Sequence, residues 1–247
     1  MTARQRTFGF GRTLLAVTDE RRQDTLPLFP LQTVLLPGAV LPLHLFEPRY
    51  RQLAVDLLTG KVPDRRFGIV AIKNSMVREV ETPDHLHAVG CTALLGESER
   101  LPDGRFDIVT TGERRFRLLS IERSRAPYLV GTVEWLPDDR LPPLAAEATA
   151  RLSASARAAH RRYCESAWDR DTWHPPEPGT DPAALAYLLA ADCLLPLADR
   201  QRLLAETHPL RRLRLVCRLL AREAGILSAL RAVPAPPQEF LTPASLN

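Results

Sequence analysis

The sequence predicts an α+β fold in which a closed or nearly closed β-barrel precedes a bundle of helices. From Leu26 to about Trp135, short apolar runs rich in β-branched residues are separated by turn signals such as Pro102–Gly104. From about Pro143, leucine and alanine recur at helical spacing instead. We therefore expect a flexible leader over residues 1–24, a barrel with one inserted helix over 25–140, a helical bundle over 141–232 and a proline-rich tail over 233–247.

The most apolar stretch of the chain, Leu26–Tyr50, carries five prolines. Proline locks φ and lacks a backbone donor, so it is tolerated at strand edges and in turns but not in central strands. We expect this stretch to begin as short extended pieces with a type II turn at Pro37–Gly38. After Glu47, a proline at the first helical position and apolar residues at helical spacing predict a helix that Gly60 ends.

Several further stretches of the first half are expected to form strands. The last of them places Leu129, Val133 and Trp135 on one face, which is the period of a half-buried strand. Gly112 is interpreted as a turn between two separate strands. The stretches are 66–72, 87–96, 105–112, 114–121 and 128–136.

The second half is expected to form a series of helices joined by proline-containing loops. Asp181 followed by Pro182 is typical of an N-cap and the first turn of a helix, and Pro196 ends that helix. The last helix places leucines on one face and arginines on the other. The helical stretches are 145–168, 181–195, 197–206 and 209–227.

Composition and charge narrow the classes of function. The chain has 247 residues, of which 45% are hydrophobic, and no apolar run reaches the roughly 18 residues of a membrane span. We therefore expect a cytoplasmic protein without a membrane partner. The net charge is +4, and all but two of the 33 basic residues are arginine.

Four cysteines in apolar contexts without a CxxC pair predict buried free thiols, at Cys91, Cys164, Cys193 and Cys217.

Four motifs resemble the N-terminal domain of Lon proteases, which also occurs in cereblon-like and stand-alone proteins. They are LPLFPL…LLPGAVLPLHLFEPRYRQL from Leu26, TGERRFRLL from Thr111, APYLVGTVEWLPDD from Ala126, and AADCLLPLADRQRLLAE…LRRLRLVCRLLARE from Ala190. The resemblance covers roughly residues 25–232. It implies a PUA-like β-pseudobarrel followed by an α-helical bundle.

A complete Lon protease also carries an AAA+ ATPase and a Ser–Lys peptidase, and we find the motif of neither. A phosphate-binding loop needs GxxxxGK[ST], but Gly60–Lys61 lacks the leading glycine and the following Ser or Thr. A Ser–Lys dyad needs a buried lysine, whereas Lys61 and Lys73 lie in turn-like surroundings. We therefore expect a stand-alone module that is not an enzyme.

The resemblance implies a protein-binding function, because in this family the domain recognises substrate proteins or unfolded segments for a protease. We expect unfolded or client polypeptides to bind in a groove between barrel and bundle, with Leu41, Leu43 and Phe46 near the rim as contact residues. A more specific form of this hypothesis is that the protein is an adaptor that delivers clients to a separate protease. The alternative is an RNA-binding PUA-like protein; basic charge favours it, while 6% aromatic residues and two lysines oppose it.

Two sets of histidine and cysteine residues are candidates for a metal site. His85, His87 and Cys91 form a spacing that matches no common structural zinc pattern, and we interpret them as a surface loop entering a strand. His160 and Cys164 lie one helical turn apart without visible partners, and we interpret them as a helix face between core and solvent. We expect neither a metal nor a cofactor.

Charged residues of the motifs are interpreted as structural. We expect Glu47 to cap the helix that follows it, Arg49 to pair across the rim and Tyr50 to pack with an anchored hydroxyl. A partly buried Asp192 is expected to pair with Arg200 or with an arginine of the last helix.

Two arginine clusters are able to contact phosphate or an acidic partner, but we interpret both as solvated faces. They are Arg114, Arg115 and Arg117, and Arg211, Arg212 and Arg214.

Overall fold

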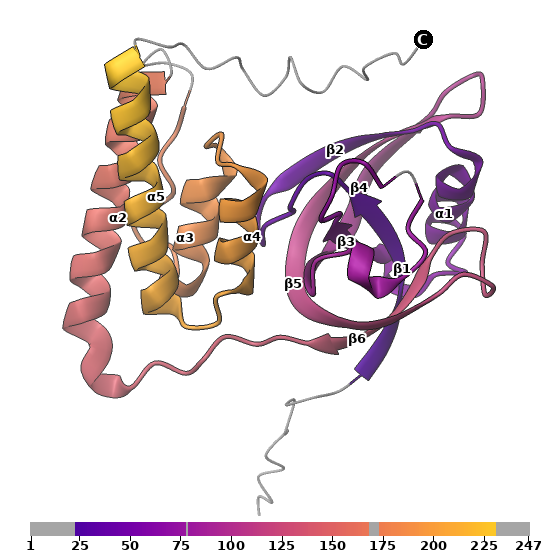
Figure 1. The fold of residues 1–247 in the computed structure, drawn as a ribbon, viewed down its shortest axis with the longest axis horizontal. Helices are drawn as coiled ribbons and strands as arrows, with labels where there is room; N and C mark the ends of the chain where they lie inside the picture. The colour runs from indigo at the N-terminus through magenta and orange to yellow at the C-terminus, as the bar shows by residue number, and fades with distance from the viewer. Residues whose placement is uncertain (1–22, 78, 168–172, 231–247) are drawn as a thin grey trace, which may run out of the picture.

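The computed structural model describes residues 23–77, 79–167 and 173–230 and has the predicted α+β architecture (Figure 1). A β-barrel lies on one side and a helical bundle on the other, while α1 lies at the end of the barrel away from the bundle. The first strand begins at Gln23, within the predicted leader. Residues 1–22 of that leader, and the predicted proline-rich tail, lie outside the described residues.

The barrel closes through one long strand. The six strands have the order β2-β5-β4-β3-β1-β6, and β6 also pairs with β5, which closes the sheet. The β1–β3 pair is parallel and the other pairs are antiparallel. The strands are β1 (Gln23–Leu31), β2 (Val40–Leu45), β3 (Arg66–Ala71), β4 (Val89–Arg100), β5 (Phe106–Glu122) and β6 (Val130–Trp135).

Strand β5 replaces the two strands predicted on either side of Gly112. It runs unbroken from Phe106 to Glu122 and pairs with β2 over its first part and with β6 over its last part. A Cβ at Gly112 would lie 2.3 Å from the carbonyl oxygen of Leu36, and the β4–β5 register shifts beside this glycine. The predicted turn is therefore wrong, because the glycine permits a close backbone approach within a bent strand.

The proline-rich stretch forms the predicted extended pieces, turn and helix. Gly38 has a φ of 80°, and the amide of Ala39 donates to the Leu36 carbonyl at 3.0 Å, as a type II turn at Pro37–Gly38 requires. Helix α1 (Pro48–Leu58) then begins after an extended Glu47. Gly60, with a φ of 79°, follows its end. These predictions are confirmed.

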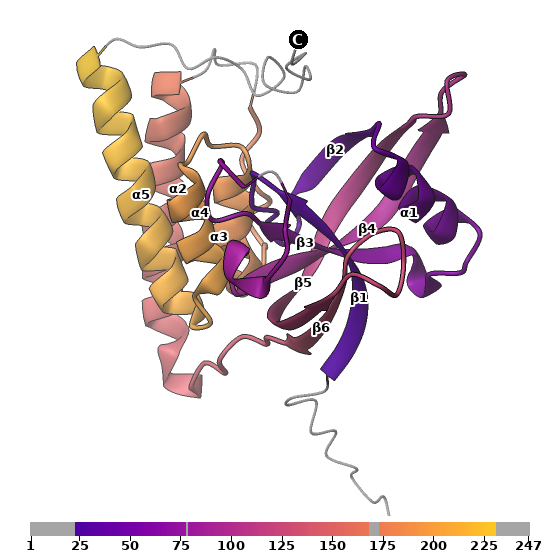
Figure 2. The same ribbon diagram turned by 45° about the vertical axis from the view of Figure 1, so that its right-hand side comes forward.

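The bundle contains α2 (Ala146–Ala167), α3 (Pro182–Ala191), α4 (Leu197–Ala205) and α5 (Pro209–Leu230). Asp181 caps α3 as predicted, since its Oδ1 accepts a hydrogen bond from the amide of Ala183 at 3.0 Å. Short 3₁₀ turns lie at Pro63–Arg65, Pro83–His85 and Pro143–Ala145. Helices α2 and α5 run side by side along the bundle, and α4 faces the barrel (Figure 2).

One main hydrophobic core runs through both halves. It includes Leu36 and Phe67 of the barrel and Leu189 and Leu213 of the bundle, each at most 1% exposed. A buried hydrogen bond of 2.9 Å from Gln201 Nε2 to the Val89 carbonyl also joins α4 to β4. Barrel and bundle therefore pack against each other rather than hanging from a linker.

The cysteines are free thiols, as predicted. Cys91, Cys164 and Cys193 are buried, whereas Cys217 on α5 is only partly covered.

Candidate functional site

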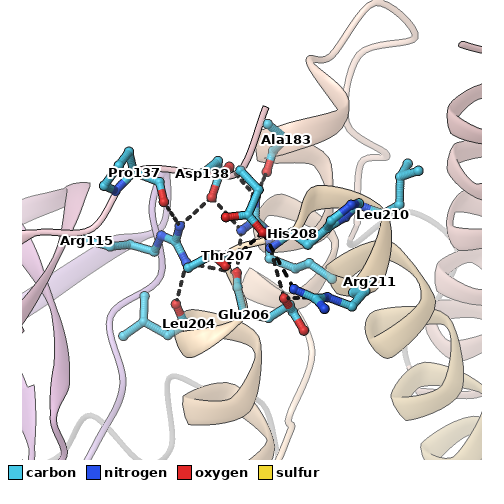
Figure 3. Close-up of polar contacts among 12 residues, drawn as sticks. Arg115, Pro137, Asp138, Ala183, Leu204, Glu206, Thr207, His208, Leu210 and Arg211 are labelled. Atoms are coloured by element: carbon cyan, nitrogen blue, oxygen red, sulfur yellow. Dashed lines mark hydrogen bonds and ion pairs between the residues drawn. The ribbon is translucent and has the colours of Figure 1, made fainter. Parts of the chain in front are cut away.

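The barrel and the bundle meet at a network of two arginines around one carboxylate, which we call the joint network: Arg115, Asp138 and Arg212. Figure 3 shows Arg115 and Asp138 of this network with their partners. Arg212 Nη1 and Nη2 donate to the two oxygens of Asp138 at 2.8 and 2.5 Å. Arg115 donates to the same carboxylate and to the carbonyls of Leu204 and Glu206, both at 2.9 Å. Side chains from β5, α5 and the segment after β6 are thereby fixed together.

Both arginines of the network are buried, contrary to the prediction of solvated faces. Arg212 is 0% exposed and Arg115 is 6% exposed. The Arg212 guanidinium also lies 4.2 Å from the ring centroid of Tyr187, a cation–π distance. The other cluster members Arg114, Arg117, Arg211 and Arg214 remain exposed.

A groove lies beside the joint network, between barrel and bundle, with a volume of about 510 Å³. The barrel contributes Pro37, Trp135 and Leu136, and α3 contributes Tyr187 and Leu188. The Leu188 side chain reaches the turn, since a Cβ at Gly38 would lie 2.8 Å from its Cδ2. A groove of this volume and lining is typical of ligand sites in proteins.

Two features of the groove involve polar groups. Tyr187 is 3% exposed, and its hydroxyl has no hydrogen-bond partner within the part of the chain that the structure describes. Burial raises the pKa of Tyr187, so this hydroxyl is a neutral donor and acceptor. Trp135 is half-buried, and the Arg114 guanidinium lies 4.1 Å from its ring centroid.

A second hollow of about 580 Å³ opens at the barrel mouth and shares Arg114 and Trp135 with the groove. Its wall is braced by the buried Asp56 of α1. That carboxylate accepts hydrogen bonds from the Tyr128 hydroxyl at 2.8 Å, Gln52 at 2.7 Å and Lys61 at 3.0 Å. Burial acts to raise the pKa of Asp56, but these bonds outweigh it and hold the pKa below its usual range.

The family model for the ATP-dependent protease La (LON) substrate-binding domain matches residues 25–222. The chain belongs to this family. Among curated relatives, the Lon protease of Trichlorobacter lovleyi is 28% identical over 87% of this chain, and Lon protease 1 of Thermus thermophilus is 30% identical over 80%. This LON substrate-binding domain spans 26% and 24% of those two relatives, about a quarter of their length.

Two solved structures share the fold. The Lon N-terminal domain protein from Xanthomonas campestris is 26% identical, with a TM-score of 0.54 over 85% of this chain and 99% of that one. The N-terminal domain of the Mycobacterium avium complex Lon protease is 21% identical, with a TM-score of 0.61 over 80% and 98%. The predicted resemblance and fold class are thereby confirmed.

The residues predicted to contact polypeptide lie on a different part of this LON domain. Leu41 and Leu43 are half-buried on β2 and pack against the main core. Phe46 is 57% exposed just beyond β2, where its ring stacks on His44. None of the three lines the groove between barrel and bundle.

The groove residues come from segments that are far apart in the sequence, so no local pattern predicted their meeting. Two signals were nevertheless present. The sequence predicts the turn at Pro37–Gly38 and places Trp135 and Leu136 at the end of the last predicted strand, but neither signal indicates which segment these residues contact.

Among the residues that the structure describes, no three His, Cys, Asp or Glu side chains lie close enough together to hold a metal ion. His85 lies on a 3₁₀ turn and accepts from the amide of Glu81 at 3.4 Å, while Cys91 is buried on β4. His160 and Cys164 do meet, with Nε2 and Sγ 3.5 Å apart, but both are at most 1% exposed. Their predicted position between core and solvent is therefore wrong, since Trp173 packs edge-on against His160 and Cys193 contacts Cys164.

The buried Cys164 also contacts Cys193. Hydrogen bonds from Cys193 and His160 lower the pKa of the Cys164 thiol, whereas burial raises the pKa of Cys193.

Several predicted structural pairs are rearranged. Glu47 makes no side-chain cap; it accepts from Arg49 at 2.8 Å, so Arg49 pairs locally and not across the rim. Tyr50 packs edge-on against Phe29 with ring centroids 4.0 Å apart, and burial raises its pKa to about 12.

The predicted partly buried Asp192 is exposed, because α3 ends at its position. Arg200 instead donates to the carbonyls of Val34 and Cys193, both at 3.4 Å. The buried carboxylate of this region is Asp199, which binds Arg202 at 3.0 Å and Arg222 at 2.7 Å.

No helix within the described ranges is both long enough and apolar enough to cross a bilayer.

Proposed function

We propose that this chain is a non-catalytic module that binds segments of unfolded or client polypeptide in the groove between barrel and bundle. One observation carries the proposal. The groove combines apolar walls from Pro37, Leu136 and Leu188 with the Arg114–Trp135 stack, in a domain of the LON substrate-binding family. Apolar side chains of a client would leave water when they bind there.

The residue types at the groove support a binding role. Trp135 and Arg114 belong to two of the three residue types that dominate binding energy at protein interfaces. The Arg114–Trp135 stack holds both side chains in place before binding, which lowers the entropy cost of association.

Site-specific photo-crosslinking tests the proposal. We place benzoylphenylalanine at Leu188 in the groove or at Leu58, an exposed leucine on α1 at the far end of the barrel. With a permanently unfolded, carboxymethylated client, we expect crosslinks from position 188 and none above background from position 58. In a direct binding assay, Leu188→Glu is expected to weaken client binding by roughly tenfold, whereas Leu58→Glu leaves it unchanged.

Equal crosslinking from both positions, or no binding of the client, would rule the groove out. The groove would be a nucleic-acid site and not a polypeptide site if the wild-type protein retained single-stranded RNA on filters at low salt and Leu188→Glu did not.

We further propose that the module serves protein quality control as an adaptor for a separate protease. The support is the family itself, since the relatives are proteases in which this domain makes up about a quarter of the chain. Depletion of the protein from a cell extract is expected to slow degradation of an unfolded client. Wild-type protein, but not Leu188→Glu, should restore it; an unchanged rate after depletion would contradict the adaptor role.

A further inference from the structure

A second surface of the molecule lies on the bundle, on helices α2, α4 and α5. It is a hollow of about 850 Å³ lined by four arginines: Arg202, Arg211, Arg214 and Arg218. Its floor is apolar and consists of Leu152, Ala205, Leu215 and Cys217. We call this surface the arginine hollow; it shares no lining residue with the groove.

The positive charge of the arginine hollow is only partly neutralised by carboxylates of the same chain. Arg202 and Arg211 have carboxylate partners, Asp199 and Glu206, at 3.0 and 3.1 Å. Arg214 and Arg218 form no ion pair with any residue that the structure describes. Glu206 is the one carboxylate among the lining residues, and it already accepts from Arg211.

The arrangement costs stability in the isolated protein. Arg214 and Arg218 lie one helical turn apart on α5, where like charges at i and i+4 destabilise a helix. Arg162 of α2 adds to the charge, since it lies close enough to Cys217 to act on that thiol electrostatically. A carboxylate-bearing ligand would remove this repulsion.

We propose that the arginine hollow binds an acidic, amphipathic segment of a partner protein. Carboxylates of the segment would pair with Arg214 and Arg218, and its apolar side chains would cover Leu152 and Ala205. The lining contains no aromatic residue on which a base could stack, which disfavours a single-stranded nucleic acid. The inference is independent of the polypeptide groove, and a protein that uses both surfaces would hold a client and a partner at once.

The test uses the full chain and a fluorescein-labelled, 18-residue amphipathic peptide of Glu and Leu at helical spacing. We expect saturable binding by fluorescence anisotropy that weakens as salt rises. Charge reversal by Arg214→Glu with Arg218→Glu should reduce the affinity at least tenfold, as about two lost charge-assisted contacts imply. The control reverses two exposed barrel arginines, Arg117→Glu with Arg123→Glu, which changes the net charge by the same amount.

The proposal is supported only if Arg214→Glu with Arg218→Glu reduces the affinity at least tenfold, the control variant retains the wild-type affinity, and both variants keep the wild-type circular dichroism spectrum. Equal losses in both pairs would show attraction to net charge alone and would overturn it. So would tight binding of the matching Lys–Leu peptide, or displacement of the acidic peptide by single-stranded RNA at a lower concentration than by unlabelled peptide. Leu188→Glu should leave this binding unchanged, which separates its outcome from that of the groove.

Discussion

At the scale of single residues, Asp138 neutralises two buried guanidinium groups, those of Arg115 and Arg212. Both arginines are at most 6% exposed, whereas the Asp138 side chain is 27% exposed. Removing the carboxylate would therefore leave two charges in a region of low dielectric constant with only carbonyl and ring partners. The cost of such a change comes from the arginines that remain and not from the lost ion pair itself.

We expect Asp138→Ala to lower the free energy of unfolding by about 3–5 kcal/mol, the range for breaking a buried pair. Urea unfolding followed by circular dichroism measures it. The control is the neighbouring Asp139→Ala, since that side chain is 47% exposed and lies 3.6 Å from Arg211. A change of about 1 kcal/mol or less is expected there. Similar losses in both variants would show that the joint network does not hold barrel and bundle together.

At the scale of elements, β5 depends on one glycine to serve two partners. It pairs with β2 before Gly112 and with β6 after it, and the carbonyl of Leu36 occupies the space that a side chain would need. The amide of Gly112 also donates to the carbonyl of Ala39 at 2.9 Å, so the turn after β1 is tied to the bend in β5. Neither backbone segment is able to move without breaking this contact.

Alanine at two glycines should therefore have opposite effects. Gly112→Ala is expected to destabilise the protein by about 1–3 kcal/mol, because the added methyl group meets backbone and not a flexible side chain. Gly225→Ala is expected to stabilise it by about 0.5–1 kcal/mol, because that glycine lies within α5 with nothing inside 4 Å of its Cβ position. Thermal unfolding checks both, and a neutral Gly112→Ala would contradict the close approach.

At the scale of the whole molecule, each half contains a buried carboxylate whose pKa is held low. In the barrel, bonds from Tyr128, Gln52 and Lys61 outweigh the burial of Asp56. In the bundle, Arg222 and Arg202 outweigh the burial of Asp199. Both folded-state pKa values therefore lie below those of the unfolded chain. The stabilisation is complete above an unfolded pKa of about 3.9 and is lost as pH falls through the folded pKa.

We expect the free energy of unfolding to fall steeply below about pH 4, and Asp56→Asn to reduce that dependence. Because one core runs through both halves, the fluorescence of Trp135, measured in a Trp168→Phe, Trp173→Phe background, and helical circular dichroism should report the same urea midpoint at each pH. Two separate midpoints would show that barrel and bundle unfold independently. If the free energy of unfolding depends on pH equally in the wild type and in Asp56→Asn, Asp56 is not the cause of that dependence.

The sequence by itself determined the local elements and the family. Proline and glycine positions predicted the turn at Pro37–Gly38 and the limits of α1, and Asp181 predicted the start of α3. These features depend on residues a few positions apart, so they do not depend on contacts with distant parts of the chain. The motifs that resemble the Lon N-terminal domain likewise required no coordinates, and the family match confirms them.

Only the tertiary structure decided which charges are buried and where a groove forms. The neighbours Arg211 and Arg212 look alike in sequence, yet one is exposed and the other is 0% exposed. The difference is a carboxylate 74 residues away, at Asp138. A buried charge is tolerated only beside a partner, and the chain reveals that partner only when β6 and α5 are brought together. The groove and the continuous β5 have the same origin, since each is made by segments that meet only in the folded protein.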